Sequence, residues 1–169
     1  SFPEAVRRLA DRAKIPLEFE SDGASDQGRF LKDALLDLHE QIAQRWQSAL
    51  STEAAGEPGR AYLAQRGLSA EATRLFRLGY APEAWDDTVN WARSKSYELS
   101  VVEKAGLILH KAEADHYYDR FRGRLMFPIC DKQGRVIGGT GRVLAGDEIA
   151  AQYVNSPETL IFTESKVFF

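Results

Sequence analysis

The residues best suited to chemistry in this sequence are arginines that alternate with aromatic side chains. Arg120, Arg122 and Arg124 stand two apart, directly after Tyr117 and Tyr118. Residues two apart share one face of a strand, so an extended segment would align the three guanidinium groups in a row. Guanidinium forks match phosphate oxygens, and aromatic rings, here including that of Phe121, stack on unpaired bases. The pattern is compatible with binding of single-stranded nucleic acid or a nucleotide, but such charge runs are more often a solvated sheet face, here balanced by acidic helices.

Positive charge is concentrated in this part of the chain. Between His116 and Arg142 there are six basic residues and two acidic ones, whereas the whole chain of 169 residues has a formal charge of −3. The overall charge excludes a uniformly basic nucleic-acid coat. A content of 44% hydrophobic and 28% charged residues is typical of an ordinary globular domain.

Two short motifs follow the arginines. The glycine-rich run over 138–142 either cradles a phosphate or marks a bulged strand that another backbone approaches closely. It lacks the third glycine and the helix of a dinucleotide-binding fingerprint. In the second motif, Pro157 biases Ser156 towards an extended shape, so that Asn155 presents its amide beside a turn. An amide offers donors and an acceptor to a nucleotide, but the same motif also occurs in ordinary turns.

Several other classes of site are disfavoured. Cys130 lies in an apolar run, which predicts a packed and inert thiol, and the three histidines lack metal-ligand spacing, so we expect no metal site. The hydrolase motif Gly-x-Ser-x-Gly is missing. The chain has no apolar run of membrane-spanning length, and its first residues do not resemble a secretory signal. We therefore expect a cytoplasmic protein without membrane contact.

The patterning predicts an α+β fold, with a helical amino-terminal half over about 1–106 and a small, mainly antiparallel β-sheet over about 107–169. Helices are expected over 2–14, 30–50, 58–65 and 85–94, with a flexible polar connection over 21–28. Ser69 is expected to cap a further helix whose Leu75 and Phe76 point inward, and Ser100 to open a capping box before Gly106. Strands are expected over 107–110, 124–130 and 135–144, with a hairpin turn over 131–134.

The motifs together resemble a known family. The run Asp119-Arg120-Phe121-Arg122-Gly123-Arg124 and its continuation to Ile129, then 131–138, 141–144 and 153–159, are similar in order and spacing to the bacterial DnaG-type DNA primases. The segments 1–6, 62–69 and 79–82, with Trp85, resemble the same family, so the similarity covers essentially the whole chain. The resemblance identifies the amino-terminal subdomain of the primase RNA-polymerase core.

The resemblance implies synthesis of short RNA primers on a single-stranded DNA template during replication, from ribonucleoside triphosphates and beside a replicative helicase. It also implies a zinc-binding domain with a structural Zn before this region and a TOPRIM domain after it, whose carboxylates would hold Mg or Mn. Neither pattern occurs in this sequence. We therefore expect a fragment without catalytic residues that holds template and nucleotide at the nucleoid-associated replication machinery.

Six residues are expected, from their positions in the resemblance, to contact nucleic acid or nucleotide: Arg66, Arg120, Arg122, Arg142, Asn155 and Lys166. Gln152 and Glu164 stand where the family often has lysine, and we expect Lys166 to substitute for the second. Arg124 is either part of the groove or a structural partner of Asp131 or another acid. The competing hypothesis is a non-catalytic module that binds single-stranded nucleic acid, a nucleotide or a protein partner.

Overall fold

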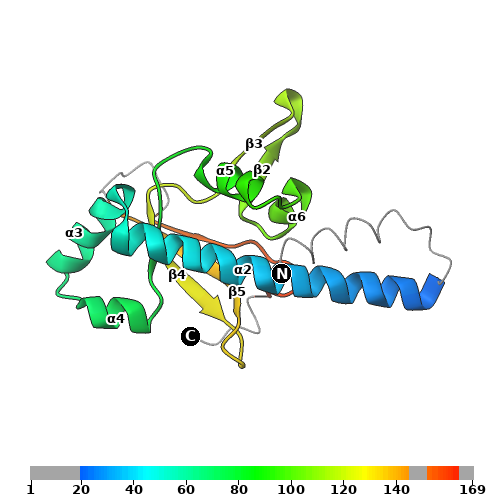
Figure 1. The fold of residues 1–169 in the computed structure, drawn as a ribbon, viewed down its shortest axis with the longest axis horizontal. Helices are drawn as coiled ribbons and strands as arrows, with labels where there is room; N and C mark the ends of the chain where they lie inside the picture. Colours follow the sequence, from blue (N-terminus) through cyan, green and yellow to red (C-terminus); the bar gives the residue numbers. More distant parts are fainter. Residues whose placement is uncertain (1–19, 145–151, 164–169) are drawn as a thin grey trace.

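The longest element of the computed structural model, which describes residues 20–144 and 152–163, is helix α2 (Glu20–Thr52), which crosses the molecule in Figure 1. Its apolar face is buried as expected, with Leu38, Ile42 and Trp46 at most 5% exposed. The expected polar connection over 21–28 is wrong, because α2 includes these residues. Adding residues to an existing helix costs little once packing has stabilised the rest. The expected helix over 2–14 lies outside the described residues.

Four antiparallel strands form the main sheet, in the order β1 (Gly79–Ala81), β4 (Arg124–Cys130), β5 (Val136–Val143) and β6 (Tyr153–Asn155). The expected hairpin turn between β4 and β5 is confirmed, with Gly134 at a φ of +82°. Strand β1 is absent from the strands expected from the sequence, since three residues carry no detectable period. Gly79 lies against α2, where a Cβ would come within 2.6 Å of the Trp46 Cβ.

The remaining elements are arranged around α2. They are η1 (Ala54–Gly56), α3 (Glu57–Gln65), α4 (Ala70–Leu75), α5 (Asp87–Ser94), α6 (Leu99–Lys104) and a separate antiparallel hairpin of β2 (Ile108–Lys111) and β3 (His116–Asp119), with η2 (Ala112–Ala114) at its tip. In Figure 1 the β2–β3 hairpin and the β4–β5 hairpin project from α2 in different directions. The α+β class is thus confirmed. No helix among the described residues is long and apolar enough to cross a membrane.

The helix boundaries confirm some expectations and correct others. Ser69 caps α4, because its Oγ accepts a hydrogen bond of 3.0 Å from the Ala72 amide. Leu75 and Phe76 do not point inward but are 74% and 62% exposed, since the six-residue α4 buries none of its side chains. Ser100 forms no capping box, because α6 already begins at Leu99.

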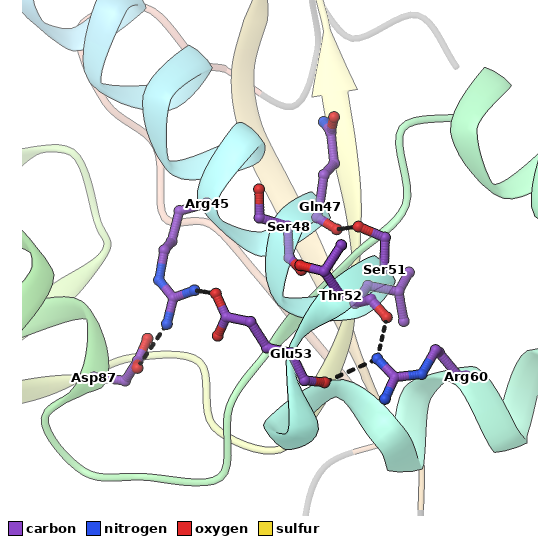
Figure 2. A network of polar contacts seen from close by, with 9 residues as sticks. Arg45, Gln47, Ser48, Ser51, Thr52, Glu53, Arg60 and Asp87 are labelled. Atoms are coloured by element: carbon purple, nitrogen blue, oxygen red, sulfur yellow. Dashed lines mark hydrogen bonds and ion pairs between the residues drawn. The ribbon is translucent and has the colours of Figure 1, made fainter.

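A polar network fixes the end of α2 (Figure 2). Arg45 forms ion pairs with Glu53 and Asp87, and so connects α2 with the start of α5. Arg60 on α3 donates to the backbone carbonyls of Leu50 and Glu53, at 2.7 and 2.9 Å, at the end of α2, where helix carbonyls lack partners within the helix. The network therefore holds α3, which ends directly before Arg66, against α2.

Candidate nucleic-acid interface

An arginine from β5 and a tyrosine from β6 form the first part of the interface. Arg142 lies directly opposite Tyr153 in the β5–β6 pairing, which places both side chains on one face of the sheet. The Arg142 guanidinium carbon is 5.3 Å from the Tyr153 ring centroid, and Nη1 donates to the Tyr153 hydroxyl. Half of Tyr153 is exposed. The pair therefore presents a fixed cation beside an accessible ring.

Helix α3 adds a second arginine to the same place. The Tyr62 ring centroid lies 5.6 Å from the Arg142 guanidinium carbon and 5.0 Å from that of Arg66. Tyr62 thus joins two of the predicted residues that are far apart in the sequence, and we call these two arginines with Tyr62 and Tyr153 the arginine–tyrosine cluster. The Arg142 Nε is buried without a hydrogen-bond partner among the described residues.

Arg120 and Asn155 form the next part of the interface. The Arg120 guanidinium donates to the Asn155 backbone carbonyl at 3.1 and 3.3 Å, and the Asn155 side-chain oxygen accepts from Thr140 Oγ1 at 3.0 Å. Asn155 ends β6, and the next residue continues the ladder: the Ser156 amide donates to the Gly139 carbonyl, and Ser156 Oγ accepts from the Gly139 amide, both at 2.8 Å. These contacts hold Asn155 in place at the edge of the sheet.

Arg122 lies in a separate cleft. Its guanidinium carbon is 3.9 Å from the ring centroid of Trp85, which is 63% exposed and meets Tyr118 edge-to-face at 6.0 Å. The cleft is open and encloses about 770 Å³. Its remaining lining residues are His110, Lys111, Ala112, Glu113 and His116. An exposed indole beside cations is a surface on which an unpaired base stacks.

The expected row of three arginines does not form. Strand β3 ends at Asp119 and β4 begins at Arg124, so the residues between them are not an extended strand. Arg124 is only 8% exposed and donates to the Gly141 carbonyl at 3.1 Å, which makes it a structural residue of the sheet. Phe121 is unavailable to bases, because it is buried edge-to-face against Trp46.

The glycine-rich run is a packed strand. A Cβ at Gly141 would lie 3.0 Å from the Arg124 side chain, and one at Gly138 would lie 3.2 Å from the Ser156 Cβ. Because β5 is paired with β4 on one side and β6 on the other, its amides are used within the sheet. The phosphate cradle is therefore wrong, and the groups that approach Gly138 and Gly141 closely are side chains rather than another backbone.

The described residues contain no group of three His, Cys, Asp or Glu side chains that could hold a metal ion. Cys130 is half-buried, and burial raises the pKa of its thiol, so it is a poor nucleophile. Lys166 lies outside the described residues.

Three residues of the interface, Tyr62, Trp85 and Tyr153, were missed as site residues from sequence, although Tyr153 lies in the motif that indicated Asn155. Tyr62 stands four positions before Arg66, a spacing that places both on one helix face and could have indicated the pair. Trp85 has no such local signal, because tertiary packing alone brings Arg122 over its ring.

Arginines at the surface of an α+β unit that lie against aromatic rings are typical of proteins that bind single-stranded nucleic acid. Comparison with known families narrows this class. Residues 46–169 match the family described as DNA primase catalytic core, N-terminal domain. The chain is 34% identical over its whole length to the DNA primase of Staphylococcus aureus strain COL and 39% identical to that of Deinococcus radiodurans, and spans 28% and 27% of these proteins.

Solved structures agree with this assignment. A structure of the DnaG primase catalytic domain bound to ssDNA superposes with a TM-score of 0.70 and 38% identity, over 79% of this chain and 40% of that one. The zinc-binding and RNA polymerase domains of Aquifex aeolicus primase give a TM-score of 0.67 and 25% identity, over 83% of this chain and 32% of that one. The chain belongs to the DnaG-type DNA primase family, in the N-terminal domain of the catalytic core.

Proposed function

We propose that this chain holds the single-stranded DNA template, and positions the incoming ribonucleotide, in a primase that synthesises short RNA primers during replication. The observation that carries the proposal is the arginine–tyrosine cluster, in which Arg66 and Arg142 share the Tyr62 ring. That a related catalytic domain is bound to ssDNA supports it. Family membership favours this function over a non-catalytic binding module, since the relatives that we compared are DNA primases.

The geometry suggests how a strand is held. Arg66 and Arg142 would bind phosphates, because their guanidinium groups are fixed by aromatic rings and need little ordering when an anion binds. The exposed ring of Tyr153 would stack on a base. Asn155 and Arg120 extend the surface along β6, and Arg122 with Trp85 offers a second stacking position.

The part of the reaction assigned to this chain is binding and orientation. Phosphoryl transfer requires charge neutralisation and in-line placement of the attacking hydroxyl, for which polymerases use carboxylate-bound metal ions. The described residues supply no such carboxylate group. In our proposal the Mg or Mn ligands, the structural zinc and the contacts to a replicative helicase belong to other domains of the parent enzyme, which acts in the cytoplasm at the nucleoid.

The binding step is tested by fluorescence anisotropy with a labelled single-stranded oligonucleotide, titrated over salt, and with duplex of equal length. We expect a preference for the single strand and a linear fall of log affinity with log salt, by about 0.7 per phosphate contacted. Arg93→Ala is a matched control, since Arg93 is exposed in the last turn of α5 and takes part in none of the contacts that define the interface. Absence of binding at low salt would contradict the proposal.

The catalytic context is tested with a chimera. This chain replaces the corresponding segment of the Deinococcus radiodurans primase, to which it is 39% identical, and incorporation of labelled ribonucleotides on single-stranded DNA is measured. We expect the chimera to make primers and Arg66→Ala to reduce their yield. A folded chimera that binds DNA but makes primers equally well with and without Arg66 would contradict the assigned role.

A further inference from the structure

Asp119 is the most deeply buried carboxylate near the interface, at 1% exposure, and the strand-binding surface described above does not use it. It is the last residue of β3 and lies opposite Ile108 of β2. A buried carboxylate is costly unless hydrogen bonds compensate for lost hydration. The hydrogen-bond partners of the Asp119 carboxylate therefore indicate its structural role.

The Asp119 carboxylate binds the start of α5. Oδ2 accepts from the Thr88 amide at 2.7 Å, and Oδ1 accepts from the Val89 amide at 3.0 Å. These amides belong to the first turn of the helix, where backbone donors lack partners within the helix and negative charge is stabilised. The residue in the N-cap position, Asp86, makes no side-chain capping bond. Asp119 thus caps α5 from a distant part of the chain.

The backbone of Asp119 binds both members of the cleft's stacked pair. Its amide donates to the Trp85 carbonyl at 2.7 Å, and its carbonyl accepts from Nη1 of Arg122. Trp85 stands two residues before α5, so the carboxylate fixes the same segment a second time through the helix start. Asp119 therefore binds the backbone of Trp85 and the guanidinium that lies 3.9 Å from the Trp85 ring centroid.

We infer that Asp119 is the positioning residue of the Trp85–Arg122 cleft: by binding the first turn of α5 it holds the indole under the guanidinium, in the arrangement that stacks on an unpaired base. The inference rests on the proposed function, because it deepens the strand-binding role of the cleft. Burial raises the pKa of Asp119 to about 6, while the amide hydrogen bonds act in the opposite direction. The group is therefore mainly ionised and able to accept both bonds at neutral pH.

A double-mutant cycle tests the inference on the 169-residue chain. The dissociation constant for a short labelled oligothymidine is measured for the wild type, Trp85→Ala, Asp119→Asn and the double variant. Asparagine keeps the shape but replaces one acceptor oxygen by a donor group, so one α5 amide loses its partner. We expect Asp119→Asn to weaken binding by about threefold or more, and to have no further effect when Trp85 is already removed.

The matched control is Asp131→Asn. Asp131 also accepts backbone hydrogen bonds, from Gln133 and Arg135, but in the β4–β5 turn. We expect it to lower the melting temperature without changing affinity. The inference is overturned if Asp119→Asn folds and binds as tightly as the wild type. It is also overturned if the double variant shows the product of the two single losses of affinity, because the residues then act independently.

A measurement on the wild type covers the case in which Asp119→Asn does not fold. Coupling is reciprocal, so a strand bound at Trp85 must stabilise the Asp119 contacts to α5. We expect oligothymidine to slow hydrogen exchange of the Thr88 and Val89 amides. Unchanged exchange at saturation also overturns the inference. Trp85→Ala that binds as tightly as the wild type also overturns the inference, because the cleft then takes no part in binding. If instead no oligothymidine binds to the wild type, the proposed strand-binding function itself is wrong.

Discussion

Replacing Arg142 by alanine is the most direct perturbation of the interface. The guanidinium contacts the rings of Tyr62 and Tyr153, and its Nε has no hydrogen-bond partner among the described residues. A charge-assisted bond to phosphate contributes about 1.5–3 kcal/mol, so its loss predicts about tenfold to 150-fold weaker binding of single-stranded DNA. The slope of log affinity against log salt should fall by about 0.7, the contribution of one phosphate.

The same substitution should change stability little. The two cation–π contacts of Arg142 are at a partly exposed site, where each contributes about 0.5–1 kcal/mol, which corresponds to a few degrees in melting temperature. Arg142→Lys keeps the charge but loses the planar fork, so we expect an intermediate affinity with an unchanged salt slope. Fluorescence anisotropy over salt and a thermal melt measure both quantities. Unchanged affinity and slope for Arg142→Ala would refute the assignment of Arg142 to the strand-binding surface.

Three further substitutions test how the fold supports the interface. Arg124→Ala should lower the free energy of unfolding by about 2–4 kcal/mol while leaving DNA affinity within about twofold, because its guanidinium bonds the buried Gly141 carbonyl. Denaturant titration measures the stability and fluorescence anisotropy the affinity, and a larger effect on binding would contradict a structural role. Gly56→Ala should destabilise by about 3 kcal/mol or more, since its Cβ would lie 1.9 Å from the Ala49 carbonyl oxygen; an unchanged melting temperature would show that the end of α2 adapts freely. Burial lowers the pKa of His39 from 6.5 to about 4, so below pH 6.5 the unfolded chain binds a proton that the folded chain does not yet bind. The folded state is therefore at its full stability above pH 6.5 and loses about 3 kcal/mol in total as pH falls through 4. His39→Leu should therefore lose less stability than the wild type in urea titrations between pH 7 and 4, and parallel curves would refute this. The wild type is needed for comparison because Asp119, whose pKa is raised, changes stability in the opposite direction over this pH range.

Local patterns predicted elements well where packing did not decide the outcome. The apolar period of α2, the Ser69 cap and the glycine at the β4–β5 turn act within a few residues, and all three appear as expected. Patterns failed where an element is short or lies at the edge of the core. Leu75 and Phe76 were expected to point inward, but no element among the described residues covers them.

The features of the interface also separate into those that local sequence patterns predicted and those that they did not. The sequence by itself determined which part of the chain carries the positive charge and the motifs that indicate the family. Strand β6 was not expected from it, because three residues carry no detectable period. The sequence could not distinguish the roles of the three arginines in one short segment. Arg120 bonds the end of β6, Arg122 covers an indole, and Arg124 is buried.

Only the tertiary structure decided those three roles, because each depends on a partner far along the chain. Trp85 and Asn155 reach their arginines through the packing of α5 and β6, and Tyr62 reaches Arg142 through the placement of α3 at the end of α2. Side-chain period and charge are local properties, whereas burial and ring stacking follow from long-range contacts between elements. The sequence therefore determined the family and the basic segment, and the fold decided which cations remain accessible to a nucleic-acid strand.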